Sequence, residues 1–170
     1  MITTFSGLYR FRTGTVIYIT RIEDGQIYFR PITRMYRGIS FQDGTMLHYY
    51  YLYEPLKQLE ARYDLRLTDC AFWGDEHGIT VMPELSAHRG NVEKASGLDT
   101  ELLAAQLKEA LEDGKQLALP PVMLRFSRPG SHIALRQLQA EKLHISRDQI
   151  YPTHYVSDPE EQRFLLERGL

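Results

Sequence analysis

The residues whose types and spacing could do chemistry lie between Arg125 and His132. His132 follows Gly130 and Ser131 where a helix is expected to begin, and the N–H groups of a helix N-terminus attract anions. Arg125 and Arg128 stand just before this point and could clamp a phosphate. The pattern supports one of two hypotheses, an enzyme that acts on a phosphate-bearing nucleotide or nucleic acid, with His132 as acid, base or phosphate contact and Ser131 as cap and donor.

The segment around these residues resembles a known fold. Residues 98–143 run as a helix, the stretch ALPPVML at 118–124, a glycine-containing turn and a second helix. This order resembles the ParB/sulfiredoxin-like fold, whose members carry a GHHR-like phosphate-handling motif after an LPPV-like strand. Here the motif reads GSHI at 130–133, without the second histidine and the adjacent arginine. Those missing residues argue against nuclease or nucleotide-hydrolysing chemistry.

Most motifs with a defined mechanism are absent from the sequence, which has no phosphate-binding glycine loop, serine elbow or HExxH helix. Cys70 is the only cysteine, so an internal disulfide and a cysteine-based zinc site are excluded, and a small buried hydrophobe is expected there. The six histidines include no i, i+4 pair that could hold a metal, and His77 and His88 are expected in an exposed turn and loop. We therefore expect no metal and no cofactor.

The N-terminal quarter of the chain is basic and aromatic. Residues 1–40 hold six arginines and two acidic residues, a charge of +4, which leaves −6 for the rest because the whole chain carries −2. Arginine stacks on planar groups and grips phosphate or carboxylate with two hydrogen bonds. We define an Arg/Tyr surface by eight candidate partner-binding residues: Arg10, Arg12, Arg21, Tyr28, Arg30, Arg34, Tyr36 and Arg37.

Two interpretations of the Arg/Tyr surface stay open. It could contact a protein, a nucleic acid or a nucleoprotein complex. Alternatively, the tyrosines are simply good strand residues and the arginines solvate an outer face. Because no catalytic motif is assembled, the first interpretation predicts a non-catalytic binding or regulatory protein, such as an inhibitor of a nucleic-acid-handling complex. Catalysis at His132 is the alternative.

The clearest structural signal is a β-hairpin over residues 15–32, whose Asp24-Gly25 pair suits a type I′ turn. The turn predicts that Ile22 lies opposite Ile27, Arg21 opposite Tyr28 and Thr20 opposite Phe29. The face expected to be buried then holds Tyr18, Thr20, Ile22, Ile27 and Phe29. The other face holds Arg21, Tyr28 and Arg30, with Ile17 and Ile19 toward the base. Phe29→Ala should then cost about 3–5 kcal/mol.

The remaining pattern predicts an α+β fold. Strands are expected at residues 7–12, 66–73, 79–82 and 119–126, and a second hairpin turns at Asp43-Gly44 into a strand at 45–53. Residues 32–38 suggest a loop. Helices are expected at 55–65 and 98–113, from Ser131 and from Ser157. This order predicts a mostly antiparallel N-terminal sheet or small barrel built on hairpins, with helices concentrated in the C-terminal half.

The length of 170 residues fits a single domain or two small ones. The possible division is a β-rich portion at 1–83, a loop or linker at 84–97, and a helix-strand-helix portion at 98–170. A hydrophobic content of 43% with 25% charged residues is ordinary for a soluble protein. The N-terminus lacks the pattern of a secretory signal, and no apolar run reaches ~18 residues, so a cytoplasmic protein without a membrane partner is expected.

Overall fold

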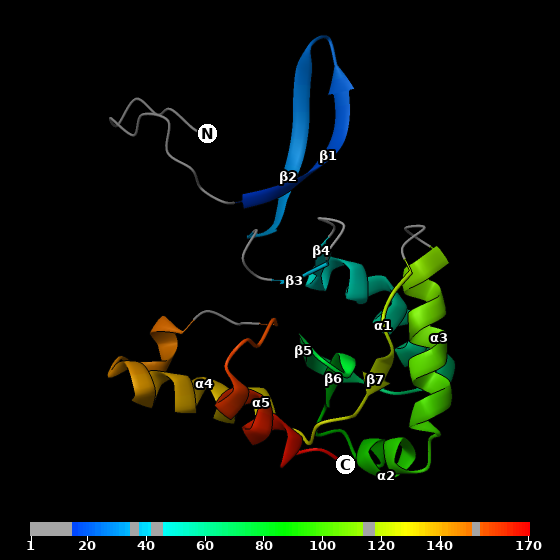
Figure 1. Ribbon diagram of the computed structural model, residues 1–170, viewed down its shortest axis with the longest axis vertical. Helices are drawn as coiled ribbons and strands as arrows, with labels where there is room; N and C mark the ends of the chain where they lie inside the picture. Colours follow the sequence, from blue (N-terminus) through cyan, green and yellow to red (C-terminus); the bar gives the residue numbers. More distant parts are fainter. Residues whose placement is uncertain (1–14, 35–37, 42–45, 114–117, 151–153) are drawn as a thin grey trace.

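The computed structural model describes residues 15–34, 38–41, 46–113, 118–150 and 154–170 (Figure 1). Its body is built on a sheet in the order β5 (Leu67–Asp75), β6 (Gly78–Leu85) and β7 (Val122–Leu124). β5 and β6 form an antiparallel hairpin, whereas β7 is parallel to β6 and follows α2 (Asn91–Ser96) and α3 (Thr100–Asp113). The α+β class is confirmed, and the described strands form no barrel.

Helices cover both faces of this sheet. α1 (Tyr49–Tyr63) and α3 enclose the larger core, while α4 (Ser131–Leu143) and α5 (Pro159–Leu166) enclose the smaller one. Side chains alternate along β5, so that Phe72 enters the larger core and Ala71 and Trp73 enter the smaller one. Burial on both faces explains why the centre of β5, Cys70 to Trp73, is continuously apolar in sequence. Cys70 and Trp73 are buried, as predicted.

Two helix starts have aspartate caps. The Asp99 carboxylate accepts the backbone N–H groups of Glu101 and Leu102, both at 3.0 Å, so α3 begins two residues after its predicted start. Asp158 likewise accepts the Glu160 N–H at 2.9 Å at the start of α5. A short 3₁₀ helix, η1 (Arg147–Gln149), lies between α4 and α5.

The second predicted hairpin is only partly correct. β3 (Gly38–Ser40) and β4 (Met46–His48) pair antiparallel, while the turn residues lie outside the described part of the chain. Residues 49–53, predicted as strand, form the first turns of α1, and Pro55 lies inside that helix. Tertiary packing overrides the β-propensity of the tyrosines, because Leu52, Leu56 and Leu59 recur at helical spacing and are all buried.

Several boundaries also differ from the predictions. Residues 32–34, predicted as loop, belong to β2 (Gln26–Arg34), and β7 is shorter than the strand predicted at 119–126. Residues 84–97, predicted as loop or linker, contain the end of β6 and helix α2. The predicted strand at 7–12 lies outside the described residues. The division into domains stays a prediction.

The first hairpin and its turn are confirmed. β1 (Thr15–Glu23) pairs antiparallel with β2, and both turn residues have positive φ, 49° at Asp24 and 75° at Gly25, as a type I′ turn requires. The pairs Ile22–Ile27 and Arg21–Tyr28 are those predicted. The predicted pairing of Thr20 with Phe29 is wrong.

A β-bulge at Thr20 changes the faces of the hairpin. Ile19, not Thr20, lies opposite Phe29, and the Thr20 hydroxyl donates to the Tyr28 carbonyl at 3.0 Å. Since residues opposite each other share a face, the bulge brings the apolar side chains of both strands together. We call this set the apolar hairpin face: Ile17, Ile19, Ile22, Ile27 and Phe29.

The apolar hairpin face is exposed, which contradicts the predicted core face. Phe29 is 57% exposed and Ile22 67% exposed, and the hairpin projects away from the body of the molecule (Figure 1). The alternation of residues reports which side chains share a face but not whether another element covers that face. The body has its own two cores, and none of these five side chains belongs to either.

Candidate functional site

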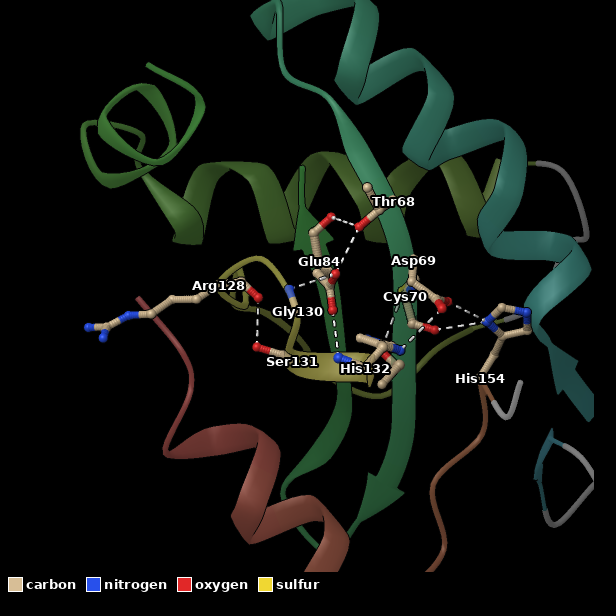
Figure 2. Close-up of polar contacts among 10 residues, drawn as sticks. Thr68, Asp69, Cys70, Glu84, Arg128, Gly130, Ser131, His132 and His154 are labelled. Carbon is tan, nitrogen blue, oxygen red and sulfur yellow. Dashed lines mark hydrogen bonds and ion pairs between the residues drawn. The ribbon is translucent and has the colours of Figure 1, made fainter. Parts of the chain in front are cut away.

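A buried polar cluster lies where β5 and β6 meet the start of α4 (Figure 2). The Glu84 carboxylate, on a residue only 5% exposed, accepts three hydrogen bonds. They come from the backbone N–H groups of Gly130 at 3.1 Å and His132 at 2.6 Å, and from the Thr68 hydroxyl at 3.0 Å. Glu84 therefore serves as the anion at the N-terminus of α4, supplied by the protein itself.

This arrangement changes the interpretation of His132. The helix starts where predicted, but the Gly130 and His132 N–H groups already donate to Glu84, so an external phosphate would have to displace this carboxylate from them. His132 is 4% exposed, and its Nε2 has no hydrogen-bond partner. The prediction of Ser131 as the cap is wrong: Gly130 occupies the N-cap position, and the Ser131 hydroxyl donates to the Arg128 carbonyl at 2.6 Å. The exposed Arg128 side chain points away from His132 (Figure 2).

Asp69 lies between two histidines in the same cluster. Its Oδ1 is 3.1 Å from His154 Nδ1, and its Oδ2 is 3.5 Å from His132 Nδ1. The backbone N–H of Cys70 also donates to Asp69 Oδ1, at 2.8 Å. His154 Nδ1 is 3.0 Å from the Cys70 carbonyl as well, so with two acceptors beside it this nitrogen carries the proton. The His154 ring stacks on Tyr49 at 3.6 Å between ring centroids.

The pKa values of this cluster are shifted. Burial lowers the pKa of His132, and the nearby Asp69 and Glu84 carboxylates only partly oppose the shift. Burial raises the pKa of Asp69, but the hydrogen bond from His154 and the charge of His132 outweigh it, so the net shift is downward. A neutral His132 beside an ionised Asp69 is the state expected near pH 7.

Acidification should therefore destabilise the protein in two steps. Because the folded-state pKa of His132 is below its unfolded value, the unfolded chain takes up the proton first, and stability falls as the pH drops below about 6.5. The lowered pKa of Asp69 adds a loss below about pH 4. The free energy of unfolding, measured with urea across this pH range, should fall below about pH 6.5 in the wild type and in the control His77→Gln, whose histidine is exposed. It should not fall there in His132→Gln. If the free energy of unfolding depended on pH equally in all three proteins, the assignment to His132 would be wrong.

The cluster holds the His154 imidazole in a fixed orientation, but it provides no activated nucleophile. Asp69 and the Cys70 carbonyl fix the tautomer of His154, which leaves Nε2 as a possible proton acceptor. A hollow of about 150 Å³ between α1 and β5 borders Asp69, Tyr49 and Cys70. The Cys70 thiol is buried, and burial followed by the charge of Asp69 raises its pKa, which disfavours a thiolate.

The sequence did not single out Asp69, Glu84 or His154 as site residues. The register of the β5–β6 hairpin could have indicated two of them, because Asp69 and Glu84 lie directly opposite each other in it. His154 is distant in sequence and approaches only because residues 154–156 run along β5, where the Phe72 N–H donates to the His154 carbonyl at 2.7 Å.

Two side chains of the Arg/Tyr surface are described, and they do lie together. The Arg21 guanidinium carbon lies 3.9 Å from the centroid of the Tyr28 ring, and Arg21 also pairs with Glu23 at 3.5 Å. The remaining members lie outside the described residues or side chains: Arg10, Arg12, Arg30, Arg34, Tyr36 and Arg37. Their common surface stays a prediction.

Two further observations bear on the class of protein. Within the described residues, no group of three or more His, Cys, Asp or Glu side chains could hold a metal ion. No helix in that part of the chain is long and apolar enough to cross a membrane. The expected cytoplasmic location stays a prediction.

Comparison with known proteins shows the fold. No family model and no curated protein matches this chain. Solved structures do match, among them "GH3.15 acyl acid amido synthetase" and "AtGH3.15 acyl acid amido synthetase in complex with 2,4-DB". Each has a TM-score of 0.68 and 20% identity over 99% of this chain, but only 32% of the synthetase chain is covered. The chain thus spans about a third of these structures and shares the fold of that third.

Proposed function

We propose that this chain is a protein-docking module that packs its apolar hairpin face against a partner protein and contributes no chemistry of its own. The observation that carries the proposal is the exposure of that face. An isolated two-stranded hairpin is marginally stable in water, and a contiguous exposed apolar face commonly marks an interaction site. A partner packed against this face would bury its apolar side chains and would also stabilise the hairpin.

The two faces of the hairpin suit different parts of an interface. The apolar hairpin face supplies the desolvated centre, where fully burying a side chain such as Phe29 is worth about 1.5–3 kcal/mol. The Arg21–Tyr28 pair on the opposite face supplies residue types enriched in binding hot spots. The apolar face favours a protein over a nucleic acid, because phosphates offer it nothing to bury.

The fold likeness indicates where to look for the partner. In the amido synthetases the matching third belongs to a chain with two further thirds. We expect the partner to be a polypeptide region comparable to that remainder, on a separate chain or on the same one. Such an assembly could be an enzyme in which this module positions or regulates a catalytic region.

The hairpin faces can be tested separately by protein capture. Replacing Ile22 and Phe29 together by aspartate should abolish capture of a protein partner from cell lysate, with or without nuclease, because it charges the apolar face. The matched control replaces Ile133 and Leu143, two exposed apolar residues of α4, by aspartate and should keep capture. Replacing Arg21 and Arg30 by glutamate should weaken capture mainly at low salt. Equal loss in the hairpin and α4 variants, or capture that survives in the hairpin variant, would refute the proposal.

A specific observation supports a second candidate, acid–base catalysis at His154. Its Nδ1 is anchored by Asp69, the orientation that histidine bases use in catalytic triads. It is the weaker candidate because the nearby Cys70 thiol is buried, with its pKa raised.

A further inference from the structure

Among the described residues, the outer edge of the sheet at β7 is covered at one end and open at the other. Beyond the strand, the Phe126 carbonyl accepts the Leu170 N–H at 3.0 Å, and the Arg128 N–H donates to the Arg168 carbonyl at 3.1 Å. Residues 168–170 therefore run antiparallel along this edge, through the bridge between Ser127 and Gly169. They reach residue 126 but do not pair with β7 itself.

The backbone of β7 shows which groups face outward. The Ile79 N–H donates to the Pro121 carbonyl at 2.8 Å, and the Arg125 N–H donates to the Val81 carbonyl at 3.1 Å, so residues 121 and 125 face β6. Along a β-strand, successive residues direct their backbone N–H and C=O groups to opposite sides. Val122 and Leu124 therefore point these groups away from β6. Within the described residues these groups have no hydrogen-bond partner.

A groove accompanies this open edge. It has a volume of about 470 Å³ and lies between β7 and α3, which runs alongside β7 in Figure 1. Ala104 and Ala105 form its wall on α3, and their small side chains leave room for a larger one. Lys108 and Arg125 also line the groove, and Glu101 is the one acid among the described residues of its lining, so the lining is net positive; Lys108 also pairs with Glu112 at 3.7 Å, which leaves Arg125 as its less compensated cation.

We infer that this groove binds an extended peptide segment of a partner protein, which adds a strand to β7. The segment runs antiparallel to β7, in line with residues 168–170. Its backbone pairs with the outward groups of Val122 and Leu124, which gives affinity without regard to sequence. An aliphatic side chain over Ala104 and Ala105 and a carboxylate near Lys108 or Arg125 give selectivity.

The test selects random-sequence peptides on the purified chain and measures the affinity of the enriched ones by fluorescence anisotropy. Enriched peptides should carry aliphatic and acidic residues. Ala105→Trp, which fills the groove from an exposed position, should weaken their binding by at least about tenfold. Leu102→Trp, which places the same bulky residue at an exposed α3 position that does not line the groove, should not. Circular dichroism checks that both variants fold.

Amide exchange identifies the atoms involved. The Val122 and Leu124 amides should exchange readily in the free chain and at least about tenfold more slowly with bound peptide. No enriched peptide, equal binding by Ala105→Trp, or protection in β1 and β2 instead would overturn the inference. Protection that grows with protein concentration alone would assign the edge to a second copy and overturn it too. The Ile22 and Phe29 double aspartate variant should still bind the peptide, which separates this inference from the hairpin proposal.

Discussion

Glu84→Ala is expected to destabilise the folded protein by about 3–5 kcal/mol, because it leaves polar groups buried without their acceptor. The Gly130 and His132 N–H groups and the Thr68 hydroxyl would all lose the carboxylate. Water has little access to replace it, since Glu84 is 5% exposed and His132 is 4% exposed. Urea unfolding followed by circular dichroism measures the loss.

Two companion variants separate the hydrogen bonds from the general effect of removing a carboxylate. Glu84→Gln keeps one acceptor oxygen in place and should lose less stability than Glu84→Ala. Glu76→Ala removes a carboxylate whose side chain is 86% exposed in the turn of the same hairpin, and it should change stability by no more than about 0.5 kcal/mol. If Glu84→Ala also cost less than about 1 kcal/mol, the three hydrogen bonds would contribute little.

Phe72→Ala and Phe29→Ala delete the same group of atoms with very different expected results. Phe72 is fully buried in the larger core, so its loss leaves a cavity and should cost about 3–5 kcal/mol. Phe29 is 57% exposed on the hairpin, so its loss should cost less than about 1 kcal/mol in the isolated chain. The large cost predicted from the sequence for Phe29 thus belongs to Phe72.

The same pair of variants tests the position of the hairpin. If Phe29→Ala proved as costly as Phe72→Ala, the apolar hairpin face would be packed against this chain's own body. When a partner is bound, Phe29→Ala should cost more stability than in the isolated chain, since the Phe29 side chain would then be buried in the interface. A measurement with and without the captured partner therefore links the stability of the hairpin to docking.

Local patterns determined much of this fold. Asp24-Gly25 specified a type I′ turn because both of its residues adopt positive φ, and the hairpin formed around it. The strands at 66–73 and 79–82 were predicted from local pattern, and they form most of the β5–β6 hairpin. The start of α5 was predicted at Ser157, two residues before its first helical residue, Pro159, and Asp158 between them is the cap.

Only the tertiary structure decided which surfaces are buried and which polar groups meet. Alternation along the first hairpin could not show that its apolar face is exposed among the described residues, nor that a bulge at Thr20 moves Ile17 and Ile19 onto that face. Glu84 reaches the start of α4 across 48 residues of sequence, and His154 reaches the Cys70 carbonyl across 84. Such contacts depend on how separate elements pack, and a pattern within one element carries no information about the neighbour that will satisfy it.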